Sequence, residues 1–192
     1  MTESVVSTRP FEGLQIPVAG TYALDPAHKR VGFIARHMMV AKVRGQFAEA
    51  SATITVGEDP LQSSVTATIT TASIETGTVD RDNHLRSGDF FESEKYPTME
   101  FRSTGIKEHA GAEFVLDGEL TIKGITKQVE LTVEFEGAAT HPSGKPVFGF
   151  SAHTEIDRED WGLTWNMAVE GGGVLVGRKV KIEIEGEAVL QG

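Results

Sequence analysis

The chain has 192 residues, of which 39% are apolar and 24% charged, and this composition is typical of one globular domain. Its net charge of -10 excludes nucleic-acid binding through a broad basic face and argues against simple adsorption to an anionic membrane. The absence of cysteine excludes disulfides, thiolate nucleophiles and cysteine-based zinc sites.

Residues 1–19 show no sustained hydrophobic period and contain Pro10 and Pro17, so we expect a flexible tail before a single domain over 20–192. The tail lacks the basic opening and the apolar core of a secretory signal. No run approaches the roughly 20 apolar residues of a membrane span. The sequence therefore predicts a cytoplasmic protein without stable membrane insertion.

Apolar and polar residues alternate from Thr21 onward, which indicates β-strands with one wet and one apolar face. The alternation is clearest over 129–136, where Val129, Leu131 and Val133 share one face. Turn residues separate the predicted strands. We expect the other seven strands at 31–37, 43–56, 64–71, 98–103, 113–122, 147–157 and 180–188.

Long antiparallel strands with one apolar face must close on themselves or stack as two sheets. We therefore predict an all-β fold, an extended eight-stranded antiparallel lipocalin-like barrel. Small residues on the inward face leave room for a cavity. A flattened, filled barrel is the alternative. The small inward residues are Ala35, Ala52, Ala67, Gly118 and Ala152.

The segment RDNHLRSGDFF interrupts the strands, and we expect a short helix over about 80–91 with Asp80 as its N-cap. Its charges suit a plain surface cap or a polar cluster that holds a ligand head group. Ser87, His84 and Asp82 have the residue types of a hydrolytic triad. Asp82 and His84 diverge on a helix, however, and no nucleophile elbow is present.

The six histidines form neither HxH nor HExxH, so no metal site is predicted. His37 falls on an inward strand face, which is more typical of a hydrogen-bonded core residue. A second irregular stretch, DREDWGLTWN, predicts a short helical turn near 157–161 capped by Asp157. Trp161 and Trp165 would either staple this loop or form an aromatic lip at the barrel mouth.

Four segments in order resemble the YceI-like family: YALDPAHKRVGFIARHMMVAKVRGQF, SIETGTVDRDNHLRSGDFFESEKYPTMEFRS, GELTIKGITKQVELTVEF and IDREDWGLTW. The resemblance covers about 21–188. It implies a lipocalin-like barrel that binds a polyisoprenoid without catalysis, for transport, storage or stress-related handling, and it favours a homodimer. Many relatives are periplasmic. Lys29 stands where relatives usually have serine, and Arg178 where they often have an acidic residue.

The implied ligand is a prenylated quinone or an isoprenoid phenol or alcohol, and no other cofactor is expected. Its head group would contact His37, Arg81, Asp82 and His84. An enzyme that uses Arg81, Asp82 and His84 on an isoprenoid or quinone, and an interaction protein with a filled barrel, are the alternatives. The isoprenoid tail would lie along Val31, Phe33, Ala35, Ile69, Phe90, Phe91, Phe101, Phe148 and Phe150.

Overall fold

The computed structural model describes residues 6–192, which form twelve strands, one α-helix and three 3₁₀ turns. The helix is α1 (Val79–Arg86), and the 3₁₀ turns are η1 (Pro60–Gln62), η2 (Thr71–Ser73) and η3 (Arg158–Trp161). The strands are β1 (Thr8–Phe11), β2 (Leu14–Pro17), β3 (Gly20–His37), β4 (Ala41–Phe47), β5 (Ala50–Val56), β6 (Ser64–Thr70), β7 (Ile74–Glu75), β8 (Thr98–Ala110), β9 (Glu113–Ile122), β10 (Ile125–Thr140), β11 (Pro146–Asp157) and β12 (Val176–Leu190).

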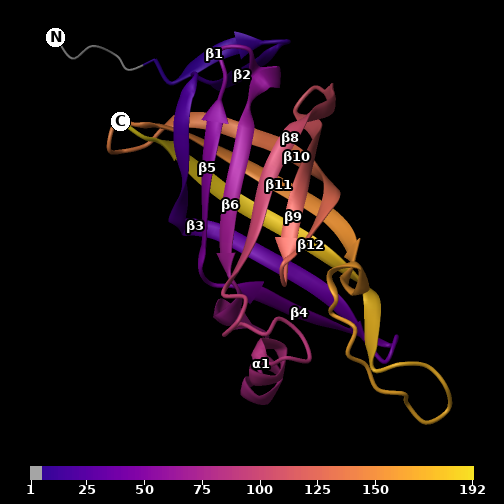
Figure 1. The fold of residues 1–192 in the computed structure, drawn as a ribbon. Helices are drawn as coiled ribbons and strands as arrows, with labels where there is room; N and C mark the ends of the chain where they lie inside the picture. The colour runs from indigo at the N-terminus through magenta and orange to yellow at the C-terminus, as the bar shows by residue number, and fades with distance from the viewer. Residues whose placement is uncertain (1–5) are drawn as a thin grey trace.

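Eight antiparallel strands close into a barrel, because β12 at one end of the sheet pairs with β3 near the other. The order around the barrel is β3, β5, β6, β8, β9, β10, β11 and β12 (Figure 1). β3 is long enough to have two partners on its other side. Its first residues pair with β5 and its last residues with β4, which in turn pairs with the short β7. The predicted eight-stranded antiparallel barrel is confirmed.

The single strand predicted over 43–56 is wrong, since the chain breaks there into β4 and β5. At the break, the Ala48 amide donates to the Ser73 carbonyl at 3.0 Å and the Glu49 amide to Ser73 Oγ at 3.0 Å. The two strands pair with different halves of β3. Hydrophobic alternation continues on both sides of the break, so the pattern does not reveal it.

The flexible tail predicted over 1–19 is wrong for residues 8–17, which form the β1–β2 hairpin across one end of the barrel (Figure 1). The Arg9 guanidinium donates to the carbonyls of Gly57 and Glu58, and Ile16 is buried. The contacts of Arg9 join residues 48 and 49 positions apart, and such long-range contacts leave no local signal in two four-residue strands. Residues 1–5 of the predicted tail lie outside the described residues.

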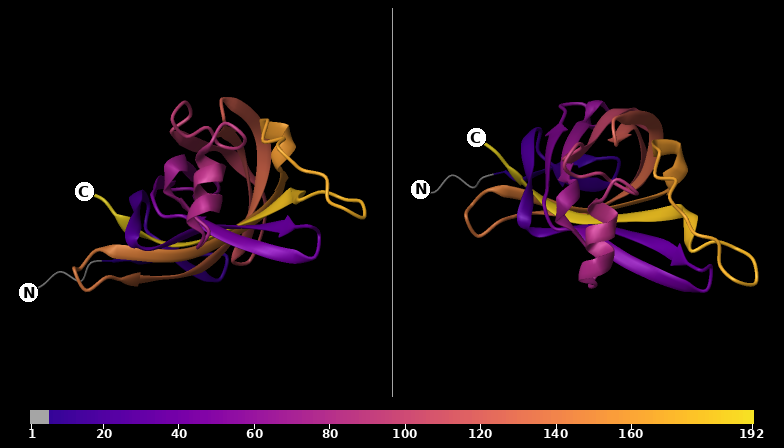
Figure 2. Two further views of the ribbon diagram at one scale, coloured as in Figure 1. Left: turned by 90° about the horizontal axis from the view of Figure 1, so that it is seen from below. Right: turned by 60° about the horizontal axis from the view of Figure 1, so that its bottom comes forward.

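α1 lies at the opposite end of the barrel from the hairpin (Figures 1 and 2). It begins after Thr78 rather than at Asp80, and it ends before Ser87, so it is shorter than the predicted 80–91. The Ser87 hydroxyl donates to the His84 carbonyl at 2.6 Å, which turns the chain out of the helix. The predicted turn after Asp157 is confirmed as η3, and the Asp157 carboxylate accepts from the Glu159 amide. No described helix combines the length and hydropathy that a membrane crossing requires.

Candidate ligand cavity

The barrel encloses a cavity of about 390 Å³ that reaches from the β1–β2 hairpin to α1. Phe11 and Ile16 line it at the hairpin end, and Leu85 and Phe90 line it at the α1 end. Its volume falls within the usual range of small-molecule sites, and its walls are almost wholly apolar. The alternative of a filled barrel is therefore wrong.

Small inward side chains account for the hollow interior. Ala35, Ala52, Ala67 and Ala152 all line the cavity, as their alternation predicts. Gly118 has a different role, because a Cβ added there would lie 2.4 Å from the Phe101 ring. The glycine therefore makes room for an aromatic wall rather than for a ligand.

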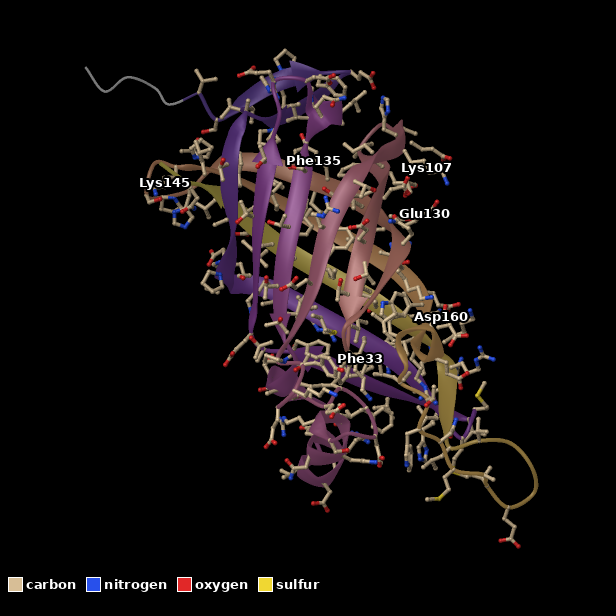
Figure 3. All side chains as sticks on the ribbon, in the orientation of Figure 1. Phe33, Lys107, Glu130, Phe135, Lys145 and Asp160 are labelled. Carbon is tan, nitrogen blue, oxygen red and sulfur yellow. The ribbon has the colours of Figure 1, made fainter. Side chains whose placement is uncertain are left out.

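The structure places all nine predicted tail residues in the cavity wall. Phe33 lies toward α1, whereas Phe135, another lining residue, lies toward the hairpin (Figure 3). An apolar chain in the cavity would therefore contact aromatic rings at both ends. The nine residues are Val31, Phe33, Ala35, Ile69, Phe90, Phe91, Phe101, Phe148 and Phe150.

None of the four predicted head-group residues belongs to the cavity wall. His37 is exposed at the end of β3, not inward as predicted. Arg81 Nε donates to Thr76 Oγ1 at 2.7 Å, and the Asp82 carboxylate accepts from the Thr76 amide at 2.8 Å. His84 Nε2 lies 2.8 Å from Asp89 Oδ2. The polar side chains of α1 thus hold neighbouring loop segments, because the helix directs Leu85 rather than its charges to the cavity.

The side chains of the catalytic alternative are not arranged for nucleophilic catalysis. Ser87 donates to the backbone carbonyl of His84, not to its imidazole, and that imidazole pairs with Asp89 rather than with Asp82. Arg81 and Asp82 are both engaged by Thr76. Nucleophilic catalysis needs a nucleophile and a base within hydrogen-bond reach, and these residues are not so arranged.

Aromatic side chains close the α1 end of the cavity. The Trp165 ring centroid lies 4.6 Å from that of His84 and 5.5 Å from that of Phe90. Trp161 is buried, and its Nε1 donates to the Leu120 carbonyl at 2.9 Å. Trp161 therefore staples the loop to β9, whereas Trp165 packs on His84 and Phe90 and is not in the cavity wall, so the aromatic lip stays a prediction.

Arg158 is a site residue that the sequence analysis missed. Among the described residues it is the only Lys, Arg, Asp or Glu in the cavity wall, and it is 5% exposed. Its guanidinium donates to the carbonyls of Leu163, Trp165, Val176 and Gly177. Burial lowers the pKa of Arg158 from its ordinary value, although an arginine stays charged at neutral pH. No sequence signal marks it, because a charged residue beside Asp157 is typical of an exposed turn.

Within residues 6–192, one group of side chains could hold a metal ion. The ligand atoms of Asp25, His28 and Glu187 lie within 4.8 Å of one another on the outer surface. His28 Nδ1 and Asp25 Oδ2 are 2.8 Å apart, and this hydrogen bond explains their approach without an ion. The bond raises the pKa of His28 and lowers the pKa of Asp25.

Sequence comparison identifies the family to which the protein belongs. The model of the YceI-like domain matches residues 22–188. The chain belongs to the YceI-like family. A UPF0312 protein of Staphylococcus epidermidis is 39% identical to this YceI-like chain over 168 residues, which are 86% of this chain and 95% of that protein. A UPF0312 protein of Staphylococcus aureus strain N315 is 36% identical over the same shares.

Solved structures share the YceI-like fold. A Campylobacter jejuni YCEI protein superposes with a TM-score of 0.71 and 30% identity, covering 82% of this chain and 90% of that one. Burkholderia cenocepacia BcnA gives a TM-score of 0.73 at 22% identity, covering 85% and 98%. A polyisoprenoid binding domain from Saccharophagus degradans gives 0.67 at 11% identity, covering 91% and 100%.

The two departures from the family pattern both lie on the barrel exterior. Lys29 Nζ donates to the Ala48 carbonyl at 2.7 Å, at the break between β4 and β5. Arg178 pairs with Asp157 at 2.7 Å and with Glu159 at 3.1 Å. Neither residue belongs to the cavity wall, so neither alters its polarity directly.

Proposed function

We propose that this YceI-like barrel binds a polyisoprenoid lipid in its cavity without chemical turnover. The observation that carries the proposal is the unfilled apolar interior between the two ends of the barrel. Burial of a prenyl chain there is favourable by roughly 25 cal/mol per Å² of apolar surface. The shared fold of the S. degradans polyisoprenoid binding domain supports the same ligand class.

Arg158 is the proposed contact of an oxygen-bearing head group. Its Nη2 has two N–H groups, and the structure gives this atom one acceptor, the Val176 carbonyl at 3.3 Å. A quinone, phenol or alcohol oxygen can accept from the second. The Arg158 guanidinium also lies 6.0 Å from the centroid of the Phe90 ring. The head group would then sit at the α1 end, and the tail would extend toward Phe135.

This arrangement supports a carrier or storage role. An enclosed apolar cavity holds a water-insoluble chain, and the described polar groups near it are engaged in holding loops. Transport, storage or stress-related handling of an isoprenoid each require retention of the lipid rather than its conversion.

Mass spectrometry of an organic extract from natively purified protein tests the proposal first. The second step adds a prenylated benzoquinone, or a hydrocarbon of the same chain length, to the delipidated protein. We expect both ligands to bind and the quinone to bind more tightly, because only the quinone can accept from Arg158. Equal binding would contradict the head-group assignment alone.

Two matched variants locate the ligand. Ala67→Phe fills the cavity from its wall, whereas Thr66→Phe adds the same bulk on the exposed outer face of the same strand. We expect Ala67→Phe to lose most of the quinone uptake and Thr66→Phe to retain it. Undiminished uptake by a folded Ala67→Phe protein, or no uptake by the unchanged protein, would rule out the cavity as the binding site.

A further inference from the structure

Two loops form a projecting surface at the α1 end of the barrel. The β3–β4 turn and the loop between η3 and β12 lie side by side (Figures 1 and 2). The Met38 amide donates to the Leu175 carbonyl at 2.8 Å, and these two residues join the loops. We call this surface, residues 36–44 and 167–175, the paired tip.

The paired tip exposes large apolar side chains. Val40 is 80% exposed and Met39 60% exposed, and Met38, Met167 and Val174 are also exposed. Single exposed apolar residues are common on soluble proteins, but a group gathered on one projection marks an interaction surface. These five residues come from both loops.

Backbone geometry shows that the methionines are not the residues this turn favours. Met38 and Met39 have φ of 51° and 60°, and the Val40 amide donates to the His37 carbonyl at 3.1 Å. The loop has three residues, since His37 pairs with Ala41, and both central residues of the turn 37–40 have positive φ, a conformation that Asn and Gly adopt far more readily. The left-handed backbone conformation is unfavourable for methionine, yet the chain has methionine at both positions. Such backbone strain is typical of functional positions.

The charge around the tip is opposite in sign to the charge of the whole protein. Residues 26–48 contain five of the 18 Lys and Arg residues and none of the 28 Asp and Glu residues. Arg36 pairs directly with Lys42 across the hairpin, and Arg44 follows two residues later on the same face. Like charges directly opposite each other are destabilising in a sheet.

These three cations have no carboxylate within 4.0 Å in the part of the chain that the structure describes. Glu170 is the one acidic residue of the paired tip. An anionic surface would therefore relieve the repulsion between Arg36 and Lys42. Apolar tips with basic flanks are complementary to the interface of an anionic bilayer, where the side chains enter the boundary and the cations meet the lipid head groups.

We infer that the paired tip docks on the surface of a bilayer containing anionic lipids, and that the cargo lipid passes between bilayer and cavity at this end. The second half of this inference rests on the proposed function. Leu163 and Val176 lie at the base of the second loop and line the cavity. Arg158 donates to the carbonyls of both, so the docking loop is attached to the proposed head-group contact.

Vesicle flotation with the full chain tests docking. The vesicles are phosphatidylcholine alone or phosphatidylcholine mixed with phosphatidylglycerol. We expect binding to the mixed vesicles only, and weaker binding as salt rises, because salt screens exposed charges. Equal binding to both vesicle types, or binding to neither, would overturn the inference.

Three double variants separate the contributions of the apolar side chains and of the positive charges to vesicle binding. Met38→Asn with Met39→Gly removes two of the five exposed apolar side chains of the tip and installs residues that favour positive φ, so the melting temperature should not fall while binding weakens on the order of tenfold. Arg36→Gln with Lys42→Gln should weaken binding to a similar degree. Lys107→Gln with Lys145→Gln changes the net charge equally at positions remote from the tip (Figure 3), and it should leave binding unchanged. An equal loss in this control would overturn the inference.

A transfer assay distinguishes failure of docking from failure of the proposed function. The unchanged protein and the Met38→Asn/Met39→Gly variant take up a prenylated benzoquinone from anionic vesicles or from detergent solution. We expect the variant to be slower from vesicles and unchanged from detergent. Equal uptake rates from vesicles for the two proteins would contradict lipid transfer at the paired tip but would leave lipid binding in the cavity supported. If the protein takes up the quinone from neither source but still floats with anionic vesicles in a tip-dependent way, lipid binding would be contradicted and docking would remain supported.

Discussion

The Phe101 ring lies over Gly118 in the wall of the cavity. A Cβ at this glycine would approach two ring carbons to 2.4 Å, closer than real Cβ contacts. Gly45 and the Phe33 ring are related in the same way, again at 2.4 Å. Large aromatic side chains can therefore line the barrel without filling it, because they rest over glycines in the neighbouring strands.

Gly118→Ala is expected to destabilise the protein by about 1–3 kcal/mol, since the new methyl group must displace the Phe101 ring in a packed wall. Urea denaturation measures the change. Gly105→Ala is the matched control, because no atom lies within 4 Å of its added Cβ and its φ is compatible with alanine. Equal stability of the two variants would show that the Phe101 ring can move aside at little cost in free energy.

The Asp25–His28 pair makes the outer surface sensitive to pH. The hydrogen bond raises the pKa of His28 above 6.5, so its stabilising contribution is complete below 6.5 and is lost as pH rises through the folded-state pKa. The pKa of Asp25 is lowered below 3.8, so its contribution is present above 3.8 and is lost as pH falls through the folded-state pKa. The pair thus stabilises the fold most between these two transitions.

Proton NMR titration checks this assignment. Asp25→Asn should lower the pKa of His28, because the hydrogen bond from Asp25 is the main cause of its shift. Glu187→Gln should lower it less, since Glu187 lies 3.7 Å away and acts through charge alone. A His28 midpoint that does not move in Asp25→Asn would refute the assignment.

At the scale of elements, the β1–β2 hairpin closes the barrel end opposite α1. Phe11, Leu14 and Ile16 line the cavity there, although nothing in their local pattern indicates a strand. Arg9 attaches the hairpin to the loop before η1, and His109 Nε2 approaches Glu12 to 3.1 Å. The hairpin is therefore held by apolar contacts at the cavity and a few polar contacts, whereas the barrel strands are held by continuous ladders.

Arg9→Ala should increase amide exchange over residues 8–17 by about tenfold or more, because hydrogen bonds from a charged donor are lost. Protection of β10 and β11 should not change. Hydrogen–deuterium exchange with mass spectrometry measures both regions. Arg102→Ala removes an arginine from an exposed ion pair with Glu119 and serves as control. Unaltered exchange of the hairpin would show that apolar contacts alone hold it.

At the scale of the whole molecule, the net charge and the placement of the charges lead to different conclusions about binding to anionic membranes. A net charge of -10 argues against adsorption to anionic membranes, yet residues 26–48, which include the β3–β4 turn, carry only positive charges. Screening limits charge interactions to about 10 Å, so a membrane at the tip responds mainly to nearby groups. The outer edge of β4 pairs with β7 only at Gln46 and Phe47, and the homodimer stays a prediction that light scattering of the purified protein tests.

A ligand held in the cavity should stabilise the entire barrel. Binding to the folded state alone adds about 2.7 kcal/mol when the free ligand is at 100 times its Kd. We therefore expect a prenylated benzoquinone to raise the melting temperature in differential scanning fluorimetry, with a smaller rise for Ala67→Phe. A rise of the same size in both proteins would place the ligand outside the cavity.

The sequence by itself determined the barrel and most of its inward residues, because strand alternation and turn residues are local properties that a single chain displays, and its motif segments determined the family. The seven tail residues that lie on strands are in the cavity wall for this reason, and Phe90 and Phe91 reach it from the segment after α1. Only the tertiary structure decided which polar groups face the cavity. The side chains of Arg81 and Asp82 bond to Thr76, while Arg158 is buried through carbonyls of a later loop. Long-range pairing also decided the hairpin and the paired tip, since contacts between distant segments leave no periodic signal in either one.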